Sequence, residues 1–122
     1  MIVLDTTVLI DVLRGMRPAF DYLATVAEPA CSEVTRVEVL RGIRRSERDV
    51  VEELMRSMRW IAVDELIARR AGELGRAWYR SHSLTTPDLV IAATAQELDA
   101  DLATSNVRHF PMFEGLKPPY AP

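Results

Sequence analysis

Three acidic residues of this chain stand where its direction is expected to change. Asp5 follows the apolar run Met-Ile-Val-Leu, while Glu38 and Asp88 lie at the openings of segments with helical apolar spacing. Asp5 should therefore lie at the carboxyl end of a strand, the edge where open parallel α/β sheets bind ligands. Carboxylates gathered at one edge repel one another and cost stability unless a cation neutralises them. The pattern favours a shared cation-binding pocket.

Each acid also has a purely structural interpretation. Glu38 ends a Thr-Arg-Val-Glu run typical of a capping box, in which its side chain would reach the amide of Thr35. Asp88 follows Thr-Pro in the first turn of a helix, where the helix dipole favours negative charge. Asp5 could cap the helix that follows it. For each residue taken singly, the sequence leaves both interpretations open.

The elements expected to position these acids alternate between strand and helix. We expect strands at residues 1–4, 30–32, 60–63 and 101–104, and helices over about 8–13, 17–27, 35–45, 50–58, 64–82 and 86–95. The 35–45 helix should carry Val37, Leu40 and Ile43 on one face, and the 64–82 helix should bury Leu66, Ile67, Leu74 and Trp78. This alternation predicts one sheet with helices on both faces.

Composition limits the class of protein. The chain has 122 residues, 48% of them hydrophobic, which suits one domain with a proper core. The single Cys31 excludes an internal disulfide and is expected to be a small core residue, so a reducing cytoplasm is favoured. The apolar runs are too short to cross a bilayer. The net charge is −3, and five clustered arginines, at 36, 41, 44, 45 and 48, are expected mostly to face solvent, with one or two contacting a ligand.

Four segments carry a family resemblance. Residues 2–10, 35–42, 86–95 and 103–110 resemble, in that order, the motifs of PIN-domain ribonucleases, most of all the VapC toxins of bacterial toxin–antitoxin pairs. The resemblance implies a three-layer α/β/α PIN-like fold with a central parallel sheet of four or five strands. It also implies a PIN domain over residues 1–117, followed by a proline-rich C-terminal tail at 118–122. Periodicity alone would not bring Asp88 beside Asp5, but the resemblance does.

The resemblance implies hydrolysis of RNA by a water that Mg²⁺ or Mn²⁺ activates, without a covalent enzyme intermediate. Both ions prefer oxygen ligands and are commonly held by one or two carboxylates with several waters. Asp5 and Asp88 are the expected direct ligands, and Glu38 would hold the metal's water or orient the nucleophile. The expected supporting or phosphate-binding residues are Thr6, Thr104 and Asn106.

The last motif departs from the pattern of many relatives. Asn106 stands where they have an aspartate, and His109 stands where a further acid is often found. Asn106 can supply an oxygen but no negative charge, so the number of metal ions, one or two, stays open. We interpret His109 as a packing or surface residue.

Partners and rival functions follow from the same residues. The resemblance implies a cognate VapB-like antitoxin, a homodimer and an RNA substrate. The alternatives are an RNA-binding PIN-like module without cleavage activity, which Asn106 makes credible, and a receiver-type signalling domain. A receiver domain would show paired acids after the first strand, and a phosphoaspartyl phosphatase would have a second acid where Thr7 stands. Both of these classes also need a lysine at a particular place in the fold. Lys117 is the only lysine of the chain, and it stands at neither place.

Overall fold

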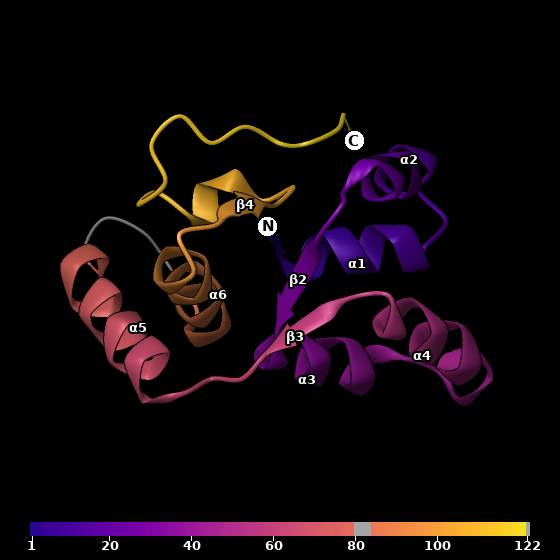
Figure 1. Cartoon of the computed structure of the whole chain (residues 1–122), viewed down its shortest axis with the longest axis horizontal. Coiled ribbons are helices and arrows are strands. Elements are labelled where there is room, and N and C mark those ends of the chain that lie inside the picture. The colour runs from indigo at the N-terminus through magenta and orange to yellow at the C-terminus, as the bar shows by residue number, and fades with distance from the viewer. Residues whose placement is uncertain (80–83, 122) are drawn as a thin grey trace.

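Four parallel strands form the centre of the molecule, in the order β3-β2-β1-β4. The computed structural model describes residues 1–79 and 84–121 (Figure 1). The strands are β1 (Ile2–Leu4), β2 (Pro29–Ser32), β3 (Arg59–Ile61) and β4 (Asp101–Ala103). The helices are α1 (Thr6–Leu13), α2 (Arg17–Thr25), α3 (Glu33–Gly42), α4 (Arg48–Arg56), α5 (Glu65–Trp78) and α6 (Thr86–Glu97), with short 3₁₀ turns η1 (Arg45–Glu47) and η2 (Val107–His109).

Strand alternation divides the core into two faces. Leu4 and Cys31 pack into one cluster with residues of α1 and α4, whereas their neighbours Val3 and Ala30 pack into another with α6. Successive side chains of a strand point to opposite faces, so a sheet buried on both sides reads as a continuous apolar run. Figure 1 shows α5 and α6 on one side of the sheet and α1, α2 and α4 on the other. The expected three-layer α/β/α fold is confirmed.

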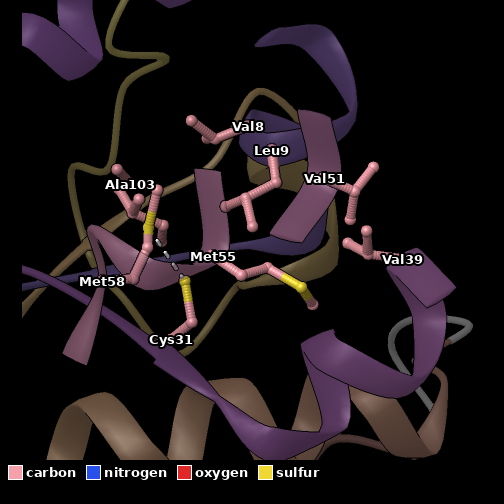
Figure 2. Packing of buried hydrophobic residues seen from close by; sticks show 9 residues of the cluster. Val8, Leu9, Cys31, Val39, Val51, Met55, Met58 and Ala103 are labelled. Carbon is pink, nitrogen blue, oxygen red and sulfur yellow. Dashed lines mark hydrogen bonds between the residues drawn. The ribbon is translucent and has the colours of Figure 1, made fainter. Parts of the chain in front are cut away.

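Figure 2 shows the packing on the α1 and α4 side, where Leu9, Val51 and Met55 meet beneath Val8. Cys31 is fully buried in this cluster, with its Sγ atom 3.7 Å from the Sδ atom of Met58. Burial raises the pKa of the Cys31 thiol to about 12, so the thiol stays protonated and inert. The expectation that Cys31 is a small core residue is confirmed.

One sequence expectation about a buried helix face was wrong, because Leu66 of α5 is 66% exposed. In α3, the apolar residues Val37 and Leu40 are 62% and 39% exposed. In α5 the buried face is set by Ile67 and Ala71, four residues apart, which pack against α6. An apolar residue next to the buried face of a helix stays exposed, because the element packed against the helix decides which face is buried.

The helix expected at 35–45 begins two residues earlier, at Glu33, and ends at Gly42. Its N-cap is Ser32, whose Oγ atom accepts a bond from the amide of Val34 at 3.1 Å. Glu38 therefore lies inside the helix, and its interpretation as part of a Thr35 capping box was wrong. The helix expected at 64–82 is α5, which runs from Glu65 to Trp78. Its expected end at residue 82 is not among the residues that the structure describes.

The C-terminal segment returns to the α1 and α2 side of the molecule (Figure 1). The hydroxyl of Tyr120 donates to Oδ2 of Asp11 at 2.7 Å, and its ring packs on Tyr22 with centroids 5.9 Å apart. Across the described part of the chain, none of the helices has the length and apolar character needed to cross a bilayer.

Candidate active site

A cavity of about 350 Å³ opens where β1 and β4 end, and Asp5, Glu38 and Asp88 all line it. These residues come from three separate elements: the end of β1, the middle of α3 and the first turn of α6. The other lining residues are Thr6, Thr7, Ile10, Asp11, Arg14, Thr85, Ser105, Asn106 and His109. We call this space the acid cavity.

Asp5 is almost wholly buried, with 3% of its surface exposed. Its Oδ1 atom caps α1 by accepting from the amide of Thr6 at 2.8 Å, and its Oδ2 atom accepts from the hydroxyls of Thr7 at 2.9 Å and Thr104 at 2.7 Å. Burial raises the pKa of Asp5, the bonds from Thr104 and Thr7 oppose that change, and the charge of Asp88 raises it further. The expected cap on α1 is confirmed, and Asp5 also lines the acid cavity.

Glu38 is held by the residue that follows Asp5. The Thr6 hydroxyl donates to Oε1 of Glu38 at 2.6 Å, and the Thr6 and Thr35 hydroxyl oxygens are 3.0 Å apart. Thr6 and Thr35 are both buried, so these contacts lie in a setting with little water. One carboxylate oxygen of Glu38 is thus fixed to the start of α1, which aligns α3 with the end of β1.

Asp88 also has two roles in the structure. It forms a capping box with Thr85 at the start of α6, with both amide-to-side-chain bonds at 3.3 Å. Its Oδ2 atom lies 3.0 Å from Nδ1 of His109, and its side chain is 14% exposed. The expected first-turn position is confirmed, and the same carboxylate faces the acid cavity.

The end of β4 supplies the opposite wall. Thr104 is fully buried, and its Oγ1 atom, besides donating to Asp5, accepts from the amide of Asn106 at 2.9 Å. Asn106 lines the acid cavity. Thr104 lies behind this lining and holds the Asp5 carboxylate through its hydrogen bond. The structure therefore brings together every residue that the sequence singled out for the site.

Sequence reasoning missed several lining residues. Thr7, Asp11 and Arg14 share one face of α1 at i, i+4 and i+7, and this spacing could have revealed them. His109 was interpreted as a packing or surface residue, yet it lines the cavity and contacts Asp88. The five clustered arginines lie outside the described cavity lining; Arg36, for example, pairs with Glu33 at 2.6 Å and stacks over Trp60 at 4.2 Å.

The donor set of the cavity suits a hard divalent cation. Carboxylate, amide and hydroxyl oxygens face the cavity, and such ligands favour Mg²⁺ or Mn²⁺. Within residues 1–79 and 84–121, no three acidic, histidine or cysteine side chains converge as a ready-made metal cluster. Mg²⁺ needs fewer, because one or two carboxylates with several waters are enough to hold it.

Comparison with known proteins places the chain in a family. The PIN-domain profile matches residues 2–113. The chain is 46% identical to ribonuclease VapC19 of Mycobacterium tuberculosis, covering 98% of this chain and all of that protein. It is also 46% identical to ribonuclease VapC10 of the same species, covering 99% of this chain and 94% of that one.

A solved structure agrees with these sequence matches. A toxin–antitoxin complex from Klebsiella pneumoniae contains a chain that superposes with a TM-score of 0.79 at 30% identity, covering 98% of both chains. The similarity spans the segments that supply Asp5, Glu38, Asp88 and Asn106. The acid cavity thus lies in a chain that belongs to the PIN-domain family and, within it, to the VapC ribonucleases.

Proposed function

We propose that this protein is a metal-dependent endoribonuclease that acts as the toxin of a toxin–antitoxin pair in the cytoplasm. One observation carries the proposal. Asp5, Glu38 and Asp88 come from three separate elements to one cavity, where burial, and to a lesser degree the charge of Asp88, raise the pKa of Asp5. Such repulsion costs stability in a protein without a cation, which supports a site selected for function instead of for folding.

Asp5 and Asp88 would hold the cation, and Glu38 would orient the attacking water through its second carboxylate oxygen. A bound Mg²⁺ or Mn²⁺ supplies a water of lowered pKa and stabilises the charge of the phosphate under attack. Thr104, Thr7 and the Thr6 amide fix the carboxylate of Asp5, so that its oxygens need not reorganise on binding. The neutral Asn106 would contact the cation's water or a phosphate oxygen.

His109 would fix the orientation of the Asp88 carboxylate through its Nδ1 contact. The His109 imidazole would also offer a hydrogen-bond donor to the RNA phosphate, and it adds no further negative charge to the site. Arg14, which lines the same cavity, is the cation best placed to attract the RNA backbone. Cleavage by a metal-activated water leaves no group attached to the protein.

The proposed antitoxin would cover an apolar groove of about 740 Å³ on the α1, α2 and α4 side. The groove includes Phe20 and Val50, which are 55% and 65% exposed, together with Val12, Leu13 and Leu54. Exposed apolar surface of this kind is typical of a protein partner. A homodimer is proposed on similar grounds, since Val37 and Leu40 of α3 are also exposed.

The direct test is cleavage of RNA by purified protein with Mg²⁺ or Mn²⁺, with EDTA, and after the metal is restored. We expect Asp5→Asn and Asp88→Asn to lose at least about a hundredfold in rate, on the scale of losing a metal-bound nucleophile. Asp21→Asn is the matched control, because Asp21 lies on the surface of α2 in an exposed pair with Arg17. Equal cleavage by all variants, or cleavage that persists in EDTA, would refute the proposal.

A second candidate is an RNA-binding module without turnover, which the neutral Asn106 and the lack of a ready-made metal cluster in the described residues favour. That module would retain RNA in a pull-down while producing no new ends in the presence of metal. The same samples therefore separate the two functions.

A further inference from the structure

A second and smaller cavity, of about 110 Å³, adjoins the acid cavity. Ile10 of α1 and Arg14, the C-cap of α1, line both cavities, so the two share a wall. The remaining walls come from Leu13 of α1, from Val39 and Gly42 of α3, and from Ile43 and Glu47 beyond α3. We call this space the side pocket; apart from Arg14, its residues have no part in the proposed cleavage step.

The body of the side pocket is apolar and rigid. Val39 is 2% exposed and belongs to the core cluster, which Figure 2 shows with Val39 beside Val51. Ile10, Leu13 and Ile43 are half-buried, so their side chains are partly fixed by packing. A volume of 110 Å³ corresponds to about four waters at about 30 Å³ each and is less than the roughly 150 Å³ that encloses a benzene ring, so the side pocket would take the edge of a planar base.

Two charged side chains complete the side pocket. Within residues 1–79 and 84–121, the guanidinium of exposed Arg14 makes no ion pair or side-chain hydrogen bond, so its fork of donors is available. The Oε1 atom of Glu47 accepts from the amide of Arg44 at 2.8 Å, which fixes the carboxylate and leaves Oε2 as an acceptor. The side pocket thus offers apolar walls, a donor fork and a fixed acceptor.

Resting on the proposed function, we propose that the side pocket binds one unstacked guanine of a single-stranded RNA whose neighbouring phosphate lies in the acid cavity. Proteins read single-stranded RNA by splaying bases into such sites and bonding their edges. Guanine presents O6 and N7 as acceptors, which suit Arg14, and amino and imino protons as donors, which suit Glu47. Adenine offers its amino group where guanine has O6, so it lacks the acceptor pair that the arginine fork requires.

Gly42 allows the side pocket to be filled without disturbing the acids. A Cβ atom built on Gly42 meets no atom within 4 Å, and its φ angle is not positive, so a side chain there enters open space. Gly42→Leu should therefore fold, and because Gly42 lines the side pocket, we expect the added side chain to obstruct it. Gly72→Leu is the matched control, because Gly72 of α5 is equally open but lines neither cavity.

The test uses the full-length chain and a pool of randomised single-stranded RNA. Cut ends are sequenced after brief digestion by the wild type, Gly42→Leu, Gly72→Leu and Glu47→Gln. We expect guanine enriched about tenfold at one position next to the cut, as one good bidentate base contact would give. Gly72→Leu should keep this enrichment, whereas Gly42→Leu and Glu47→Gln should lose most of it. An unchanged profile in Gly42→Leu, or no guanine enrichment in the wild type, would overturn the side-pocket proposal.

A second measurement separates this proposal from the cleavage activity. RNA retained by each protein in EDTA is sequenced from the same pool, which reports base preference without turnover. Guanine enrichment that Gly42→Leu abolishes supports the side pocket even if no variant cleaves RNA, an outcome that would refute only the nuclease. Retained RNA without guanine enrichment, or with equal enrichment in Gly42→Leu, overturns the side pocket whatever the cleavage result. This is also the result expected if the side pocket binds a protein side chain and not a base.

Discussion

Thr104→Val tests whether the buried charge of Asp5 depends on its hydroxyl donors. The substitution keeps the shape of the side chain but removes the 2.7 Å bond to Oδ2 of Asp5 and the acceptor for the Asn106 amide. A hydrogen bond to a charged group contributes about 1.5 to 3 kcal/mol, and Thr104 and Asp5 are both buried. We expect the free energy of unfolding to fall by about 2 to 3 kcal/mol.

For a chain of 122 residues, 1 kcal/mol corresponds to about 4 °C in Tm, so the expected loss is about 8 to 12 °C. The loss should depend on pH. The hydroxyl stabilises the ionised form of Asp5 in the folded state, so its removal costs most where that carboxyl is ionised. Because burial raises the pKa of Asp5 above 3.8, the cost should shrink as pH falls through that raised pKa.

Urea unfolding in EDTA from pH 8 down to pH 4 measures this effect. Thr94→Val is the matched control: Thr94 is equally buried, but its hydroxyl donates to the backbone oxygen of Val90 within α6 at 2.7 Å. We expect a smaller loss for Thr94→Val, about 1 kcal/mol, with no dependence on pH in this range. A Thr104→Val loss that equals the control, or that stays constant with pH, would contradict the account of Asp5.

Three further predictions concern the site, the tail and the core. Asp5→Asn should be more stable than the wild type at neutral pH in EDTA, because burial raises the pKa of Asp5 and makes its ionised form costly. This advantage should fade as the pH falls through that raised pKa. Mg²⁺ should raise the Tm of the wild type but not that of Asp5→Asn. Tyr120→Phe removes the bond to Asp11 and should lower the free energy of unfolding in urea by about 1 to 2 kcal/mol. The control Tyr22→Phe should lower it little, because the Tyr22 hydroxyl makes no hydrogen bond in the described chain. Equal losses for the two variants would count against the tail contact. Leu9→Ala, at a fully buried position, should lose about 3 kcal/mol by thermal or urea unfolding, and exposed Leu66→Ala less than about 0.5 kcal/mol.

The strands and the local places of Asp5 and Asp88 could be predicted because their signals are local. An apolar run that ends at an acid, and a Thr-Pro-Asp opening, depend on a few neighbouring residues. The buried faces of α3 and α5 could not be predicted as well. Val37 and Leu66 are apolar but exposed, and only the packing of α3 and α5 against their neighbours decides which stripe is covered.

The candidate site divides in the same way. The order of the four motifs predicted that Asp5, Glu38 and Asp88 lie in one site, although the residues around Glu38 fitted a capping box equally well. The capping error arose because Ser32 and Thr35 are both good N-cap residues, and the end of β2 selected Ser32. Contacts between distant residues, such as His109 with Asp88, leave no pattern in the sequence, since they depend on how η2 folds back over α6.

The main donor to Asp5 lies 99 residues further along the chain. Synthesis proceeds from the N-terminus, so β1, α1 and α3 leave the ribosome well before β4 and Thr104. Until β4 pairs with β1, Asp5 lacks the hydroxyl of Thr104 that holds its Oδ2 atom. Because β4 is the last strand to be made, Asp5 gains its full set of hydroxyl donors only when synthesis of the chain is nearly complete.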